Sequence, residues 1–198
     1  MTALPERPPQ PVLSSHLMTV ADYVALGEPP SGYTELQEGH LVMSPSPTVR
    51  HNVASGWLWS QLTAQLPSGL LAVQDVDVDL QLAPPDQPGS SRRPDLVVVD
   101  RATVDRVEHE GGILLAKEVR LVVEILSRGS RRMDNVIKRG EYSDAGIGHY
   151  WIVDLDPPVS LLACHLAGEF GYADDGARCG RVTITDPFPV TIDLDHLN

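Results

Sequence analysis

The amino-acid sequence predicts a mixed α/β domain of the α+β type, with a mixed central β-sheet flanked by helices. Two short continuous apolar runs are typical of strands that are buried on both faces, namely Pro94-Asp-Leu-Val-Val-Val99 and Leu121-Val-Val-Glu-Ile-Leu126. Between Val49 and Leu66 the apolar residues instead recur every three to four positions, which predicts an amphipathic helix. The length of 198 residues suits one domain, so strands and helices share one core.

The first predicted elements are a short helix and a hairpin. Thr19 is a suitable N-cap with Asp22 at the N3 position, so a helix begins there and runs to about Leu26. The segment from Tyr33 to Met43 reads as a β-hairpin with Glu38-Gly39 as its turn.

The long helix follows Pro47 and ends at Pro67. Its expected buried stripe consists of Val49, Val53, Trp57, Leu58, Leu62 and Leu66.

Strict alternation from Asp75 to Leu82 predicts a strand with one buried and one solvated face. We interpret Asp75, Asp77 and Asp79 as the solvated side of an edge strand, where charges discourage sheet-to-sheet association. The segment 83–93 reads as a loop. Further along, the pattern predicts a helix over 134–143, a strand over 149–154 and short strands from Val159 onward.

The composition indicates a soluble globular chain, with 42% hydrophobic and 21% charged residues. Two cysteines are too few for a disulfide framework, and no run approaches the roughly 18 apolar residues of a membrane span. Residues 1–15 are proline-rich and lack the apolar core of a signal peptide. We therefore expect a disordered lead-in over 1–15, a single domain over 16–198, a cytoplasmic location and no membrane partner.

The net charge of −12 excludes a broad basic surface for nucleic acid. Any contact with nucleic acid must then be local. The basic residues do cluster once, at Arg128, Arg131, Arg132, Lys138 and Arg139.

Two carboxylates stand in the predicted buried strands. Asp95 opens one strand and Glu124 lies inside the other, and a buried carboxylate is costly unless it is paired or binds a cation. Mg²⁺ is typically held by one or two carboxylates, so a divalent metal site is one interpretation. The alternative is that Glu124 pairs with Arg120 or Arg131 and that Asp95 caps a turn.

Lys138 lies on the helix that follows the Glu124 strand, from which its side chain could reach back over the sheet edge. On the same helical face lie Asp134, Glu141 and Tyr142. The alternative is a surface pair between Asp134 and Lys138, worth only ~0.3–0.5 kcal/mol. Spacing alone favours the surface pair.

A series of short motifs, in this order, closely resembles the Uma2 family of the PD-(D/E)xK nuclease-like superfamily. The motifs are Tyr33-Thr-Glu-Leu-Gln-Glu-Gly-His-Leu-Val-Met43, His51, Arg93-Pro-Asp-Leu-Val-Val-Val99, Val122-Val-Glu-Ile-Leu-Ser127, Asp134-x-x-x-Lys138, Tyr142 and Gly146-Ile-Gly-His-Tyr-Trp-Ile-Val-Asp154. The resemblance runs from about Thr19 to Asp154 and implies a restriction-endonuclease-like core.

The resemblance also implies a site. Asp95, Glu124 and the backbone carbonyl of Ile125 would bind Mg²⁺, with Mn²⁺ as a possible substitute. Lys138 would support the nucleophile or the transition state. Glu35 would complete the metal shell or hold Lys138, and His51 would contact phosphate or orient a metal-bound water.

One position departs from the superfamily pattern. The lysine of (D/E)xK should lie two residues after the glutamate, where this sequence has Leu126. Lys138 is the candidate replacement, as is general in the Uma2 family. The departure fits a migrated lysine, and it also fits weakened activity.

The resulting function hypothesis is a metal-dependent endonuclease that hydrolyses phosphodiester bonds of DNA, with a homodimer as a plausible assembly. The first alternative is a catalytically weakened or inactive module that binds nucleic acid or protein. The second is a hydrolase of small phosphodiesters. We interpret Tyr142, Tyr150 and Trp151 as structural residues, because aromatic side chains bury large areas where a helix packs on a strand.

Overall fold

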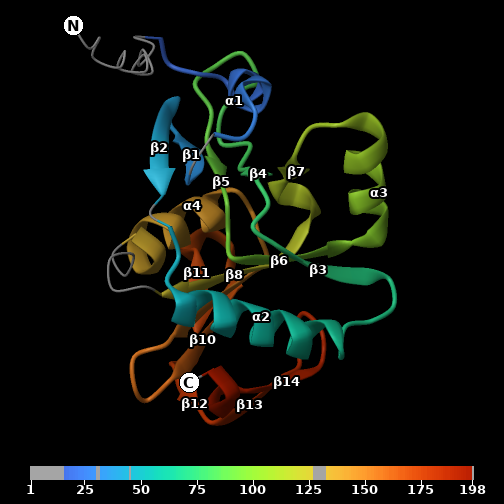
Figure 1. Cartoon of the computed structure of the whole chain (residues 1–198), viewed down its shortest axis with the longest axis vertical. Coiled ribbons are helices and arrows are strands. Elements are labelled where there is room, and N and C mark those ends of the chain that lie inside the picture. Colours follow the sequence, from blue (N-terminus) through green and yellow to red (C-terminus); the bar gives the residue numbers. More distant parts are fainter. Residues whose placement is uncertain (1–15, 30–31, 45, 127–132, 198) are drawn as a thin grey trace, which may run out of the picture.

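The computed structural model describes residues 16–29, 32–44, 46–126 and 133–197, and Figure 1 gives its overall arrangement. The predicted lead-in over 1–15 and the arginines at 128, 131 and 132 lie outside the described residues. The α-helices are α1 (Val20–Leu26), α2 (Val49–Thr63), α3 (Arg101–Glu110) and α4 (Arg139–Asp144). A π-helix, η2 (Met133–Lys138), leads directly into α4. The 3-10 helices are η1 (Ala116–Glu118), η3 (Gly168–Phe170) and η4 (Leu194–Leu197).

The strands follow the order β1 (Tyr33–Gln37), β2 (His40–Ser44), β3 (Leu70–Gln74), β4 (Val78–Asp79), β5 (Ser91–Arg92), β6 (Leu96–Asp100), β7 (Leu114–Leu115), β8 (Val119–Leu126), β9 (His149–Asp154), β10 (Ser160–Leu166), β11 (Tyr172–Asp174), β12 (Arg178–Cys179), β13 (Arg181–Ile184) and β14 (Val190–Asp193).

The main sheet has the order β11-β10-β9-β8-β6-β3 in the part of the chain that the structure describes, with β12 beside β10. The central pair β8 and β9 is parallel, and the other pairs are antiparallel. A mixed sheet with helices packed against it is the predicted fold class, which is thereby confirmed.

A smaller sheet, β2-β1-β5-β4-β7, lies with α1 and α3 in the upper part of Figure 1. The β13–β14 hairpin lies at the opposite end, below α2. The two sheets are joined through the chain segment that runs from β5 into β6, so the residues between these strands lie at the junction.

The main sheet buries a different apolar cluster on each face. Side chains of α2 and of the β13–β14 hairpin pack on one face, against residues such as Val123, Ile125 and Trp151. On the other face, Val122 and Leu126 pack with Tyr142 of α4 and with residues of the smaller sheet. Glu124 alternates with Val123 and Ile125, so it belongs to the second face.

Several predicted elements are confirmed. The capping box of α1 forms, with Thr19 Oγ1 accepting a hydrogen bond from the Asp22 N–H at 3.1 Å. The hairpin β1–β2 turns at Glu38-Gly39 as expected. The strands β6 and β8 match the two predicted apolar runs, and β9 matches the predicted strand over 149–154. The segment after β6 forms α3, which has no counterpart among the predicted elements.

The predicted buried stripe of α2 is wrong in its first half. Val49, Val53 and Trp57 are exposed, whereas the buried residues of the helix are Ala54, Ser55, Leu58 and Leu62. The helix therefore faces the sheet with small residues near its start, which lets it pack closely.

The predicted strand over 75–82 is also wrong. Asp75 and Gln81 adopt left-handed backbone conformations, with φ of 52° and 54°, which limits the strand to Val78–Asp79. This strand, β4, lies between β5 and β7 rather than at an edge. Asp77 is an ion-pair partner of Arg93, so the three aspartates do not form the solvated side of an edge strand.

No helix in the described ranges is long and apolar enough to cross a membrane.

Candidate active site

Asp95 immediately precedes β6, and Glu124 lies within the adjacent strand β8. In the antiparallel β6–β8 pair, Leu96 lies opposite Val123, so one position further Asp95 lies opposite Glu124. Val97 and Val122 pack in the same apolar cluster, and alternation along β8 places Glu124 on that same face. The two segments in which the sequence analysis found buried carboxylates are therefore neighbours in the main sheet.

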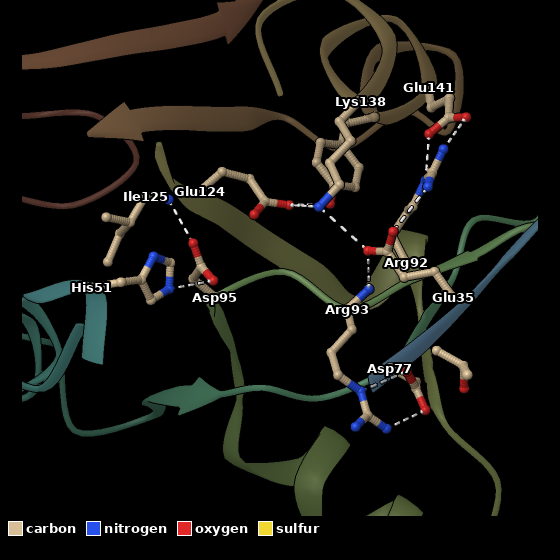
Figure 2. A network of polar contacts seen from close by, with 12 residues as sticks. Glu35, His51, Asp77, Arg92, Arg93, Asp95, Glu124, Ile125, Lys138 and Glu141 are labelled. Carbon is tan, nitrogen blue, oxygen red and sulfur yellow. Dashed lines mark hydrogen bonds and ion pairs between the residues drawn. The ribbon is translucent and has the colours of Figure 1, made fainter. Parts of the chain in front are cut away.

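Asp95 is held by two donors (Figure 2). Its Oδ1 lies 3.0 Å from Nε2 of His51, and its Oδ2 accepts a hydrogen bond of 2.6 Å from the backbone N–H of Ile125. His51 lies in the first turn of α2, whose N-cap Thr48 accepts from the His51 N–H. The start of α2 thus reaches round the end of β6 to contact the carboxylate.

Glu124 is almost completely buried, with 3% of its surface exposed. Its Oε1 accepts hydrogen bonds from Nζ of Lys138 at 2.8 Å and from the hydroxyl of Tyr142 at 2.7 Å. Burial, and then the charge of Glu124, raise the pKa of Tyr142 well above its ordinary value. The phenol therefore keeps its proton and acts as a donor to the carboxylate.

Lys138 is the last residue of the π-helix η2, and only 7% of its surface is exposed. Its ammonium lies between two carboxylates, 2.8 Å from Glu124 and 3.3 Å from Glu35. The interpretation of Lys138 as a solvated surface residue is therefore wrong. The predicted pair with Asp134 lies outside the described side chains.

Glu35, on β1, faces the site from the smaller sheet and is also buried. Besides Lys138, it accepts hydrogen bonds from the Arg92 guanidinium at 2.9 Å and from the Arg93 N–H at 3.1 Å. Burial would raise the pKa of Glu35, but the charges of Lys138 and Arg92 outweigh burial and lower it. Glu35 is therefore an ionised partner of Lys138, as one of its two predicted roles requires.

Arg92 continues the network toward α4. Its guanidinium makes two bonds of 2.7 Å to the two carboxylate oxygens of Glu141, and only 1% of its side chain is exposed. Burial opposes the charge, but the bonds to Glu141 and Glu35 outweigh it and raise the pKa of Arg92. Glu141, Arg92, Glu35, Lys138 and Glu124 thus form one continuous chain of charged groups, as Figure 2 shows.

The side chain of Arg93 belongs to a separate group of contacts. Its guanidinium bonds to Asp77 and Glu28 and lies over the ring of Tyr33, 5.2 Å from its centroid. The two arginines that precede Pro94-Asp95 therefore both neutralise carboxylates of the protein, and neither presents its charge to solvent as a phosphate-binding patch would.

Asp75 lies beside the site although the sequence pattern suggested otherwise. Its N–H donates to the Asp95 carbonyl at 3.4 Å, and the register of β3 with β6 places it opposite Asp95. Burial, and next the charge of Asp95, raise the pKa of Asp75. A left-handed conformation in a non-glycine residue often marks a functional constraint.

The structure thus brings all five predicted side chains into one region: Asp95, Glu124, Lys138, Glu35 and His51. Sequence reasoning missed the contacts of Arg92, Asp75 and the Tyr142 hydroxyl. The Tyr142 ring does pack on Tyr150, with centroids 5.2 Å apart, so its structural interpretation is only part of its role. The motif itself offered a signal, because Tyr142 follows Lys138 by about one helical turn and so lies on the same face of the helix.

The donor set fits a hard divalent cation. Among the described residues, no group of three or more His, Cys, Asp or Glu side chains is arranged to hold a metal. A structural zinc site needs four such ligands. Mg²⁺ typically uses one or two carboxylates together with water and substrate oxygens. Because N–H and C=O of one strand residue point to the same side, the Ile125 carbonyl faces the side of Asp95.

Comparison with known proteins shows the family and the fold. The model of the Uma2 family, described as "Putative restriction endonuclease", matches residues 20–177. One similar solved structure is that of a "putative nuclease belonging to DUF820" from Anabaena variabilis ATCC 29413. It has 17% sequence identity and a TM-score of 0.66, over 91% of this chain and 97% of that one, which shows a shared fold. A search of curated proteins gave no match. With most of its length matched by the family model, the chain belongs to the Uma2 family.

Proposed function

We propose that this protein is a metal-dependent endonuclease that hydrolyses phosphodiester bonds of DNA at the Asp95–Glu124 pair. The observation that supports this best is the meeting of two carboxylates on adjacent strands, with the Lys138 ammonium 2.8 Å from one of them. Carboxylates, a buried cation and a nuclease-family fold together favour attack on a phosphodiester.

Asp95, Glu124 and the Ile125 carbonyl would hold Mg²⁺, or Mn²⁺ in its place. The bound ion would supply a water of lowered pKa and balance negative charge on the phosphate.

The residues of the chain have distinct tasks in this proposal. His51 and the Ile125 N–H orient the Asp95 carboxylate, while Tyr142 fixes Oε1 of Glu124. Lys138 provides a preorganised positive charge for the phosphate oxygens or for the attacking water. Preorganised charge of this kind is effective because the group is buried and needs no reorientation.

DNA contact is local in this proposal. The net charge of −12 and the ion-paired state of Arg92 and Arg93 leave little basic surface around the described part of the site. The affinity of a protein that contacts few phosphates depends only weakly on salt. Each phosphate contact adds only about one unit to the slope of log K against the logarithm of the salt concentration. We further propose a cytoplasmic location and a homodimer, in which two sites would cut the two strands.

The test is cleavage of supercoiled plasmid, because a circle has no ends and reports endonuclease activity alone. We expect nicking with Mg²⁺ or Mn²⁺ and none with a chelator. Glu124→Gln should lower the rate by more than about 100-fold, because even outer-shell partners of a metal contribute 10–100-fold.

Glu118→Gln is the matched control, since Glu118 pairs with Arg106 away from the site. Folded wild-type protein that cuts under no divalent ion would contradict the proposal. Equal losses in Glu124→Gln and Glu118→Gln would contradict the assignment of the site.

A binding module without turnover is the second candidate, favoured by Leu126 at the position where the superfamily has its lysine. It predicts DNA or protein binding that Glu124→Gln leaves intact. Turnover of a small phosphodiester, with plasmid left uncut, would instead favour a small-molecule hydrolase.

A further inference from the structure

Arg92 is a buried arginine that lies outside the predicted metal-binding set. It belongs to the two-residue strand β5, and 1% of its side chain is exposed. A guanidinium removed from water is costly unless its donors are satisfied. Three of its bonds go to two carboxylates, of Glu35 and Glu141, and these two groups lie on different elements.

The two carboxylate oxygens of Glu35 have different partners. Oε2 accepts from Arg92 at 2.9 Å, whereas Oε1 faces Lys138 at 3.3 Å and accepts from the Arg93 N–H. With one oxygen fixed by Arg92, the other is presented to the ammonium in a defined direction. The orientation of Glu35 therefore depends on Arg92.

The bonds to Glu141 act on the helix. Glu141 follows Lys138 by three residues, in α4, and its carboxylate makes a two-pronged contact with the guanidinium. Paired bonds of this kind fix direction as well as distance. One arginine thus holds both the backbone that carries Lys138 and the carboxylate that faces its amine.

From these contacts we propose that Arg92 is a positioning residue, which through Glu35 and Glu141 keeps the Lys138 ammonium on Glu124. The inference rests on the proposed function, in which Lys138 is the cationic group of the site. Without Arg92, the buried carboxylate of Glu35 keeps Lys138 as the charged side chain that the structure describes beside it. The ammonium then moves toward Glu35 and away from Glu124.

Arg93 provides a matched control. It is the next residue, its side chain is 9% exposed, and its guanidinium also bonds to a carboxylate by two nitrogens. Its side chain leads to Asp77 and Glu28 instead, so Arg93→Met removes a comparable ion pair without touching the side-chain path to Lys138.

The experiment compares crystal structures and steady-state kinetics of wild type, Arg92→Met and Arg93→Met. In Arg92→Met we expect the distance from Lys138 Nζ to Glu124 Oε1 to exceed hydrogen-bond range, about 3.5 Å. We expect kcat to fall by about 10–100-fold, as for other supporting residues, with KM nearly unchanged. Arg93→Met should keep both the distance and kcat.

A double variant tests the route through Glu35. Arg92→Met combined with Glu35→Gln removes the unpaired charge but keeps an oxygen that accepts from Lys138. It should return Lys138 to Glu124 and recover part of kcat. A purely structural role for Arg92 predicts no such recovery.

The proposal is overturned if folded Arg92→Met keeps Lys138 on Glu124 with unchanged kcat. Should Arg92→Met fail to fold, Glu141→Gln weakens the contact that anchors the helix of Lys138 and should lengthen the distance from Lys138 Nζ to Glu124 Oε1. An unchanged distance overturns the proposal. Absence of cleavage by wild type would defeat the proposed nuclease function. The position of Lys138 in the variant structures would still decide the role of Arg92.

Discussion

The two faces of the main sheet use the same strands for different purposes. On one face, Val123 and Ile125 of β8 pack with Trp151 under α2 and the β13–β14 hairpin, in a cluster of apolar side chains. On the other face, Glu124 lies between Val122 and Leu126 and accepts bonds from two buried donors. One strand thus presents only apolar side chains to one face and a buried, hydrogen-bonded carboxylate to the other. Stability and function should therefore respond to different substitutions.

The largest effect on stability should come from the apolar face. Trp151→Ala removes a fully buried ring that packs near Phe188, and we expect the free energy of unfolding to fall by about 3–5 kcal/mol. Urea denaturation at neutral pH measures the change. A loss below about 1 kcal/mol would mean that this face is not the main source of stability.

Tyr142→Phe probes the polar face, because it removes the hydroxyl that donates to Glu124 and keeps the ring. Hydrogen bonds to charged groups contribute about 1.5–3 kcal/mol, so the free energy of unfolding should fall by that amount. Tyr172→Phe is the control: its hydroxyl donates to the neutral carbonyl of Ile147 at 2.6 Å, and about 0.5–1.5 kcal/mol is expected. Equal losses in the two variants would show that the charge of Glu124 adds nothing to the bond.

The stability that the polar side of the sheet contributes should depend on pH. The folded pKa of Glu35 lies below its ordinary value of 4.5, so its contribution to stability is complete above pH 4.5 and is lost as pH falls through the folded pKa. Glu35→Gln should flatten the curve in this acid range, by at most about 1.4 kcal/mol per pH unit for one proton. Urea midpoints from about pH 6 down to about pH 3, which begin above the ordinary pKa of a glutamate and pass below it, measure the change. Parallel curves for the two proteins would contradict an ionised, ion-paired Glu35.

The smallest effect is expected away from both faces. Arg120 and Asp100 form an exposed ion pair of 2.8 Å, and Arg120→Ala should cost only about 0.2–1 kcal/mol, less at high salt. Thermal unfolding at two salt concentrations checks this. A loss comparable to that of Tyr142→Phe would remove the distinction between surface and buried charges.

The sequence correctly predicted the elements whose hydrophobic pattern reflects which of their faces are buried. The strands β6, β8 and β9 are apolar runs because both of their faces are covered, and the same reasoning identified Asp95 and Glu124 as unusual. The hydrophobic pattern gave the wrong buried residues where the side chains that face the sheet are small. In α2 it selected Val53 and Trp57, whereas the close approach of the helix depends on Ala54 and Ser55.

Local backbone conformation and non-local pairing account for the remaining errors. The alternation over 75–82 gave no sign that Asp75 and Gln81 would turn left-handed and interrupt the strand. Arg92 lies at the end of a segment that reads as a polar loop. It is buried because β5 pairs with β1 and β4, which are distant in sequence, and no local pattern encodes such pairing.

The charged contacts of the site also form in a definite order as the chain is synthesised and folds. Glu35 and Arg92 are 57 positions apart, and Arg92 and Glu141 are 49 apart, so the network links segments that leave the ribosome at different moments. Contacts of this range close late, after local elements have formed. A growing chain therefore carries both Asp95 and Glu124 before it carries Lys138 and the helix that Arg92 holds. Completion of the site coincides with folding of the α4 region, and no shorter nascent fragment contains the whole arrangement.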